Sequence, residues 1–541
     1  MEKLSDNAEV LQNIRTSLEK VQEIKDAQLR EESLNKLVSA SIKIAENDDD
    51  LFEAGEFIYA VAELVEVVNP SKANELYKYN IELLDKLIAN YRKQGKLHEI
   101  AGLYLRAADV FEEKLNDIDQ RNEYLKSCIR SLKRQSKILI NFNGVRKLTQ
   151  NYENIAELYV KIGDYWNAIQ FFEKVINSSK ELQYFDLLSY SYQQIAECYK
   201  NLEEIQKYKN VLYDGIEYFS EWLQKYEEKN GNLTIAQIAQ ILKKLYALLD
   251  DNEQYKKYSR KEAGAYINLA ENLPKDDENY HKIARYYRGA ALCYREIDIK
   301  LIESASCFVL AGNYSEKINE YYDAATNYFD AAVLFQELDN SDRAYKHFVK
   351  AADNYWKIED FGRSTECYLN AYDIAAEGNL KFDRFGLFNQ IVKGLNKIAK
   401  EGLKNDLFFT AASLILESIK FYEQLDTAKD FMLAELVRNV YKYYYRAANK
   451  KNIGYSHIVQ SYIMASISCI LIGKMDKALQ ILSEIDGVGK TVNDYKEIVR
   501  IIIERVSKGR EVNLEVFPYH LMRLIENSDE LLYLLDLFNR T

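Results

Sequence analysis

The run GVGKT at residues 487–491 is a candidate for phosphate chemistry, because a glycine-rich loop that ends in Lys and Thr can surround a phosphate group. The full pattern also needs a strand before the loop and a glycine five residues before Gly489, where this sequence has Glu484. The residues before the run have helical spacing. We therefore interpret it as a turn between helices, with nucleotide binding as the alternative.

No other segment carries a recognisable catalytic or metal-binding motif. The 5 His lie far from one another and from any Cys at ligand spacing, and the sequence contains neither HExxH nor a Ser flanked by glycines. We therefore predict no cofactor, no metal site and no enzymatic activity. The alternative is a pair of carboxylates that only the fold brings together. The cysteines are expected to be free thiols rather than disulfide or zinc ligands, and they are Cys128, Cys198, Cys293, Cys307, Cys367 and Cys469.

Two lines of basic residues are the candidate partner-binding sites. Residues of the first line recur every four positions, with tyrosines between them, and therefore share one helix face: they are Arg438, Lys442, Arg446 and Lys450. A shorter line of the same kind consists of Lys126, Arg130 and Arg134. Such lines could bind an acidic helix, a lipid headgroup or a phosphate backbone. The alternative is a solvated face that pairs with acids on neighbouring helices.

The elements that would position these residues are most evident at residues 323–376. Alanines recur there beside aromatic residues at steps of three, four and seven, which places both on one face of a helix. The series runs through Ala332, Phe335, Ala344, Phe348, Ala351, Ala352, Tyr355, Phe361, Tyr368 and Ala371. Alanine allows two helix backbones to approach closely, and the aromatic ring fills the space beside the contact. The pattern predicts stacked pairs of antiparallel helices.

A second unit, at residues 151–176, shows how two such helices are joined. Small and large residues alternate in a fixed order: Ala156, Tyr159, Gly163, Tyr165, Ala168, Phe172 and Val175. We expect Gly163 to end the first helix and Asp164 to cap the second. This order resembles the tetratricopeptide repeat.

The composition agrees with a long helical array. The chain has 541 residues with only 3 Pro and 20 Gly, so few positions interrupt a helix. We predict an all-α fold, a right-handed superhelical array of antiparallel helix pairs. Its expected parts are an N-terminal repeat half (1–272), C-terminal repeats (280–508) and a C-terminal extension with a capping helix (509–541).

The net charge and the hydropathy of the chain limit the classes of partner that we expect. The net charge is −12, so nucleic-acid binding is not expected. The most apolar run, residues 458–473, is shorter than the ~20 residues that span a bilayer and is interpreted as a buried helix. The sequence therefore predicts a cytoplasmic protein without a transmembrane segment, and peripheral membrane association stays open.

Residues 285–376 are similar to SNAP, the soluble attachment protein. The resemblance rests on Asp323, Ala324, Ala325, Thr326, Tyr328, Asp330, Ala331 and Phe335 and on the alanine–aromatic series after them. It implies an adaptor: SNAP proteins bind acidic coiled-coil bundles of membrane fusion through a basic concave face and recruit an AAA-type ATPase. We therefore predict a non-enzymatic scaffold or adaptor that binds helical or extended protein segments. The alternatives are a peptide- or ligand-regulated sensor and, third, an enzyme on a helical scaffold.

Overall fold

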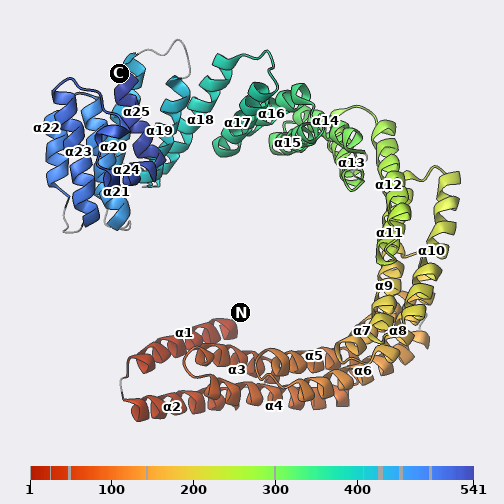
Figure 1. Ribbon diagram of the computed structural model, residues 1–541. Coiled ribbons are helices and arrows are strands. Elements are labelled where there is room, and N and C mark those ends of the chain that lie inside the picture. The colour runs from red at the N-terminus through yellow and green to blue at the C-terminus, as the bar shows by residue number, and fades with distance from the viewer. Residues whose placement is uncertain are drawn as a thin grey trace. The chain divides into compact units, whose positions relative to one another are not determined.

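The computed structural model describes residues 2–24, 26–46, 50–141, 144–297, 300–405, 407–423, 430–449, 455–485 and 490–540 (Figure 1). All regular secondary structure within these ranges is helical, which confirms the predicted all-α solenoid. The chain divides into two compact units. Unit 1 consists of Met1–Lys225 and Gln240–Tyr255, and unit 2 consists of Tyr226–Ala239 and Lys256–Thr541.

Unit 1 contains the first ten helices, which follow one another with short connections: α1 (Glu2–Glu23), α2 (Ala27–Glu46), α3 (Leu51–Glu66), α4 (Pro70–Gln94), α5 (Leu97–Glu113), α6 (Ile118–Asn141), α7 (Val145–Lys161), α8 (Tyr165–Leu182), α9 (Phe185–Asn201) and nearly all of α10 (Ile205–Glu228). The helices α11 (Asn232–Leu248) and α12 (Asn252–Asn272) contribute residues to both units.

The remaining helices belong to unit 2: α13 (Asp277–Arg295), α14 (Leu301–Lys317), α15 (Tyr321–Glu337), α16 (Ser341–Lys357), α17 (Phe361–Glu377), α18 (Arg384–Lys404), α19 (Phe408–Glu423), α20 (Asp430–Ala448), α21 (Tyr455–Leu471), α22 (Met475–Ser483), α23 (Lys490–Ser507), the 3-10 turn η2 (Leu514–Val516), α24 (Tyr519–Glu526) and α25 (Asp529–Arg540). The expected boundary between the parts 1–272 and 280–508 lies in unit 2, between α12 and α13, and stays a prediction.

The α7–α8 hairpin shows why this sequence forms helix pairs. Gly163 has φ +77°, a left-handed conformation that suits glycine and ends α7. Asp164 then caps α8, because its side chain accepts a hydrogen bond from the backbone N–H of Asn167 at 3.3 Å. Ala156, Ala168 and Phe172 are fully buried between the helices. The expected ends and packing face of this repeat are therefore confirmed.

The alanine–aromatic series forms the core of unit 2 from α14 to α17. Ala332, Ala344, Ala351, Ala352 and Ala371 are fully buried, as the sequence predicts. The large rings that fill the space beside them are also buried, and they include Phe335, Phe348, Tyr355 and Tyr368. Consecutive helices in Figure 1 accordingly lie side by side.

One close approach in this core depends on a glycine. A Cβ atom at Gly312 on α14 would come within 2.8 Å of the ring of Tyr328 on α15. The ring cannot move away easily, because Tyr328 is fully buried and its hydroxyl donates to Asn313 Oδ1 at 2.7 Å. Gly312 therefore sets how closely α14 and α15 pack.

The last helices cover the end of the repeat array. Ser528 caps α25 by accepting a hydrogen bond from the N–H of Leu531 at 3.3 Å. Leu521 and Ile525 of α24 and Leu534 of α25 are fully buried in the same core as α19 to α23. The apolar run at residues 458–473 falls mainly on α21, and its residues from Ser461 to Ile470 are buried in that core. Among the described helices, none is both long and apolar enough to cross a membrane.

Candidate functional site

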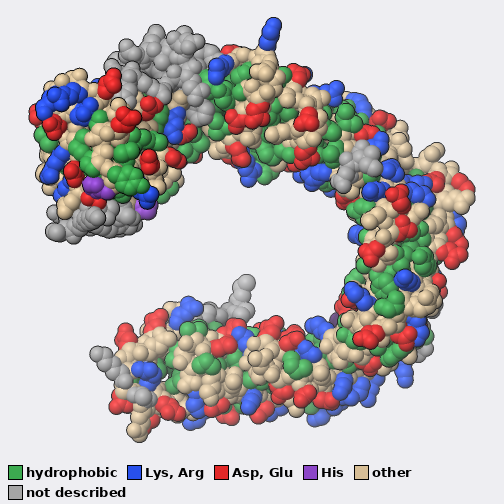
Figure 2. Space-filling model, viewed as in Figure 1, with side chains coloured by type: hydrophobic (Ala, Val, Ile, Leu, Met, Phe, Trp, Pro, Cys, Tyr) green, Lys and Arg blue, Asp and Glu red, His purple; other side chains and the backbone are tan. Residues whose placement is uncertain are grey.

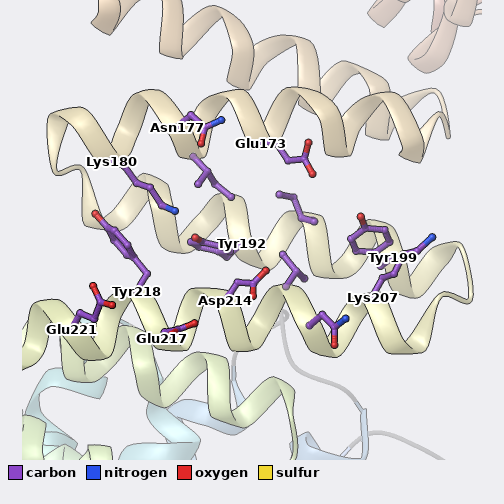
Figure 3. Close-up of a pocket in the computed structure, with 14 residues that line it drawn as sticks. Glu173, Asn177, Lys180, Tyr192, Tyr199, Lys207, Asp214, Glu217, Tyr218 and Glu221 are labelled. Atoms are coloured by element: carbon purple, nitrogen blue, oxygen red, sulfur yellow. The ribbon is translucent and has the colours of Figure 1, made fainter.

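A groove of about 690 Å³ runs across three consecutive helices of unit 1, α8, α9 and α10 (Figure 3). Each helix contributes a row of side chains at helical spacing. The row of α9 lies between the rows of α8 and α10, as Figure 3 shows. The groove lies next to the α7–α8 hairpin, which shares α8 with it.

The α9 row consists of Tyr192, Ile195 and Tyr199, at steps of three and four residues. Tyr192 and Ile195 are buried, while Tyr199 is half-buried. The ring of Tyr192 also sets the distance to α10, because a Cβ atom at Gly215 would lie 3.1 Å from it. This row therefore provides a largely apolar base.

The α10 row is acidic. Asp214, Glu217 and Glu221 recur at steps of three and four residues, are exposed and line the groove (Figure 3). Within the described part of the chain, none of these three carboxylates accepts a hydrogen bond or forms an ion pair. Each carboxylate is therefore available to a ligand.

The α8 row consists of Glu173, Asn177 and Lys180, with Ile176 beside them. Lys180 does not pair with a described carboxylate. Its Nζ atom lies 4.9 Å from the ring centroid of Tyr218 on α10 and 5.9 Å from that of Tyr192 on α9. This cation–π arrangement places the ammonium group against tyrosine faces and leaves the acids of α10 uncompensated.

A tryptophan lies near each end of the groove. Trp166 is 48% exposed, and its ring centroid lies 6.1 Å from that of Tyr199 and 4.7 Å from Lys207 Nζ. Near the other end, the ring of Trp222 lies 6.4 Å from that of Tyr218. An occupant of the groove would therefore change the surroundings of both indole rings.

The tyrosines of the groove are neutral donors at physiological pH. Burial, followed by the nearby carboxylate of Asp214, raises the pKa of Tyr192 to about 12. Burial also raises the pKa of Tyr199 and of Tyr218. The groove thus combines phenol donors, carboxylate acceptors and apolar surface. These groups can bind a segment that carries basic and apolar side chains.

The first predicted basic line lies on α20 in unit 2. Arg438, Lys442 and Arg446 are all exposed there, so the helical spacing places them on one face. The guanidinium group of Arg446 lies 5.9 Å from the ring centroid of Phe408. Lys450 lies outside the described residues. The role of this line in partner binding stays a prediction.

The second basic line lies on α6 in unit 1, where Lys126, Arg130 and Arg134 are exposed. Lys126 forms an ion pair with Glu123 at 2.8 Å. Arg130 donates to Ser127 Oγ at 2.7 Å. The two predicted lines belong to different units, and each stays a separate candidate.

The sequence does not reveal the groove, because its lining residues come from three different helices. The acidic row on α10 has a readable signal, the recurrence of acids at 214, 217 and 221 opposite the apolar residues of the same helix. Nothing in that recurrence distinguishes a ligand-binding row from a solvated face. The neighbouring rows of α8 and α9, which complete the groove, cannot be identified from that recurrence.

The GVGKT run, the histidines and the cysteines are the other residues whose types could carry chemistry. The GVGKT run lies largely outside the described residues, and α23 begins at its Lys490. His347 is a packing residue, because its ring stacks on Tyr328 at 5.9 Å and on Phe335 at 5.5 Å. The six cysteines are buried, and none of them forms a disulfide. Within the described ranges, no cluster of His, Cys, Asp and Glu could hold a metal ion.

Comparisons with known proteins agree with the repeat packing. Residues 252–417 match the family profile of the soluble NSF attachment protein, SNAP. Residues 149–181 match the profile of a tetratricopeptide repeat, and they cover the α7–α8 hairpin. A search of curated proteins found no match.

Three of the solved structures that the chain matches are the following. BtubC (BKLC) from P. vanneervenii is 16% identical, over 48% of this chain and 94% of that one, with a TM-score of 0.27. A Signal Transduction ATPase with Numerous Domains protein with a tetratricopeptide repeat sensor, from Pyrococcus horikoshii, is 11% identical, over 72% and 56%, with a TM-score of 0.30. Aspartyl phosphate phosphatase F from Bacillus subtilis is 14% identical, over 65% and 93%, with a TM-score of 0.25. At these identities and TM-scores the three structures support no inference about function.

The two profile matches, together with the buried alanine–aromatic series and the capped hairpin at Gly163, lead to one conclusion. This chain is a tetratricopeptide-like helical repeat protein that is similar to SNAP over residues 252–417.

Proposed function

We propose that the protein is a non-enzymatic adaptor that binds a protein segment in the groove of α8, α9 and α10. The observation that supports this most strongly is the row of Asp214, Glu217 and Glu221, whose exposed carboxylates have no partner among the described residues. Unpaired charges of one sign on a recessed surface favour a ligand of the opposite sign. The expected ligand is therefore a basic segment.

The dimensions of the groove suit a peptide. Its lining on α10 extends from Lys207 to Glu221, a distance of about 21 Å at the helical rise per residue. About six residues of an extended chain, or about four turns of a helix, cover that length. Ile176, Ile195 and Val211 supply apolar surface within the groove. We expect a segment in which Lys or Arg alternates with apolar residues.

A peptide-display selection on the purified full-length chain tests this proposal. Selected peptides are expected to be rich in Lys, Arg and apolar residues. Each can then be synthesised and titrated while tryptophan fluorescence is followed. The chain has 3 Trp, of which Trp166 and Trp222 border the groove and Trp356 lies on α16, so Trp356→Phe should leave the signal intact.

Charge reversal gives the matched comparison. Glu217→Arg with Glu221→Arg should weaken the binding of the selected peptide at least about tenfold, since close charge pairs at an interface contribute about 1.4 kcal/mol or more. Glu181→Arg with Glu228→Arg makes the same charge change at exposed positions outside the groove, and it should have little effect. Selection of acidic peptides, or equal binding by both double variants, would contradict the proposal. Catalytic turnover of a substrate by the pure protein would also contradict it.

A regulated sensor is the second candidate function, and the packing beneath the groove favours it. The contact of Gly215 with Tyr192 joins α9 and α10 directly under the ligand rows. A segment that displaces this ring would change the spacing of consecutive repeats. Small-angle scattering of the protein with and without the selected peptide should then differ. Identical curves at saturation would leave the adaptor without a sensing role.

The similarity to SNAP at residues 252–417 supports a narrower form, an adaptor in membrane trafficking. In that case an acidic coiled-coil bundle should bind to unit 2, and the basic line on α20 would be its candidate contact. If charge reversal on α20 does not affect the binding of such a bundle, the bundle does not bind through the α20 line.

A further inference from the structure

A second, smaller pocket of about 300 Å³ lies among α4, α5 and α6 in unit 1. Three guanidinium groups line it, those of Arg92 on α4 and of Arg130 and Arg134 on α6. The hydroxyl groups of Tyr104 and Ser127 also line it. None of its lining residues is an Asp or a Glu. The pocket therefore concentrates positive charge in a protein whose net charge is −12.

Two of the three arginines are held in place by neutral groups. Arg92 Nη2 donates to the hydroxyl oxygen of Tyr104 at 2.7 Å, and Arg130 Nη2 donates to Ser127 Oγ at 2.7 Å. In the part of the chain that the structure describes, no carboxylate forms an ion pair with Arg92, Arg130 or Arg134. Glu123, seven residues before Arg130, forms its ion pair with Lys126 at 2.8 Å, and Arg130 adds a weaker electrostatic effect on the pKa of Glu123 without an ion pair. Most guanidinium N–H groups thus stay available.

The sequence on either side of the pocket residues is rich in basic residues. Residues 86–98, which end α4 and begin α5, contain no Asp or Glu and carry Lys86, Arg92, Lys93 and Lys96. Residues 124–152 also contain no Asp or Glu. The basic residues of that stretch on α6 are Lys126, Arg130, Lys133, Arg134 and Lys137. Figure 2 shows blue side chains gathered at the lower edge of the view, where α6 lies in Figure 1.

We propose that the pocket of Arg92, Arg130 and Arg134 binds a phosphorylated side chain of a protein segment. Guanidinium groups match the geometry of phosphate oxygens and bind them through paired, charge-assisted hydrogen bonds. A phosphate monoester carries close to two negative charges at neutral pH, so several arginines are needed to compensate it. The phenol of Tyr104, which accepts from Arg92 and has its own O–H, adds a further donor at the site.

A protein segment suits this pocket better than a membrane surface does. The apolar groups of the lining are Leu97, Ile100 and the ring of Tyr104, and all three are buried or half-buried. They offer no side chain for insertion between lipid chains, whereas a recessed pocket of this volume accepts a single projecting group. The inference concerns helices other than those of the groove, and it holds whether or not a basic segment binds there.

Fluorescence anisotropy on the full-length protein tests the inference. The probe is a short, otherwise neutral, fluorescein-labelled peptide with one phosphoserine, compared with the same peptide carrying Ser or Glu at that position. The phosphopeptide is expected to bind at least about tenfold more tightly than either, and inorganic phosphate should displace it. Equal binding of the three peptides, or no displacement by phosphate, would overturn the inference without using any variant.

Variants locate the site. Arg130→Gln with Arg134→Gln should weaken the binding of the phosphopeptide at least about tenfold. The control, Lys137→Gln with Lys147→Gln, removes the same charge from exposed positions outside the pocket and should change binding less than about threefold. Equal losses in both pairs would show a diffuse basic surface and overturn the assignment to this pocket.

The membrane alternative forms the last arm of the experiment. Vesicles that contain a phosphoinositide are sedimented with the protein at the same ionic strength. The inference expects no arginine-dependent sedimentation at phosphopeptide-saturating protein concentrations. Sedimentation that depends on Arg130 and Arg134, together with no binding of the phosphopeptide, would overturn it and assign the pocket to a lipid headgroup.

Discussion

Gly312 sits in the middle of a helix, where glycine is normally unfavourable. Replacing an exposed helical glycine by alanine usually stabilises a protein by about 0.5–1 kcal/mol. At Gly312 we expect the opposite sign, because the new Cβ atom would lie 2.8 Å from the buried ring of Tyr328. The strain of such overpacking is about 1–3 kcal/mol. Thermal or urea unfolding of Gly312→Ala measures it.

Gly264 provides the control for this prediction. It also lies within a helix, α12, but no atom comes within 4 Å of the place where its Cβ would be. Gly264→Ala should therefore stabilise the protein, or at least not destabilise it. If both substitutions stabilise the protein, Gly312 does not pack as closely against the ring of Tyr328 as the 2.8 Å distance requires.

The charge state of His347 depends on its buried surroundings. Burial, and then the positive charges of Lys350, Lys346 and Arg343, lower its pKa from 6.5 to about 4. The unfolded chain therefore binds this proton at a higher pH than the folded chain does. The stability that depends on neutral His347 is complete above about pH 6.5 and is lost as the pH falls towards 4.

His347→Phe tests this, because phenylalanine keeps an aromatic ring between Tyr328 and Phe335 and has no proton to gain. Between pH 7 and pH 5, wild-type protein should lose about 2 kcal/mol more stability than the variant. Urea unfolding at the two pH values measures the difference. Parallel losses in both proteins would show that His347 is already solvated and protonated in the folded state.

At the scale of helix pairs, Ala332 is the most direct probe of the packing rule. It is fully buried in the core of α14 to α17. Ala332→Leu should cost about 1–3 kcal/mol, because the added atoms force the helices apart. The exposed Ala376 at the end of α17 is the control, and Ala376→Leu should change stability by less than about 0.5 kcal/mol. Equal effects in unfolding experiments would contradict the repeat packing.

The helix pairs were predictable because their signal is local. Ala156, Gly163 and Asp164 specify a packing face, a helix end and a cap within ten residues of one another, and the structure contains all three. The stacking of His347 between Tyr328 and Phe335 could not be predicted from the sequence, since it depends on α15 and α16 together. A lone histidine in a sequence does not indicate which rings will enclose it.

The candidate sites were less predictable than the fold for a related reason. The sequence predicts Arg130 and Arg134 as part of one basic line on a helix face, yet the pocket also needs Arg92 from α4 and Tyr104 from α5. The groove needs rows from three helices. Spacing within one helix identifies a face. Which neighbours meet that face is a property of the packed repeats.

At the scale of the whole molecule, the basic line on α20 is an exception to a net charge of −12. Arg438→Glu, Lys442→Glu and Arg446→Glu together should leave the melting temperature nearly unchanged, because the three side chains are exposed and surface changes typically stay within about 0.5 kcal/mol each. Binding of an acidic helical peptide, measured by calorimetry at low salt, should be abolished. Binding that survives the triple change would identify α20 as a solvated face.

The six buried thiols have a practical meaning for anyone who handles this protein. Burial raises the pKa of Cys128 and Cys367 to about 12, and that of Cys198, Cys307 and Cys469 to about 11. An alkylating reagent therefore reaches a sulfur atom only after the surrounding helices separate. Because these cysteines are spread from α6 to α21, the alkylation rate of each one reports local unfolding in its own part of the chain. Mass spectrometry of alkylated peptides can measure these rates separately.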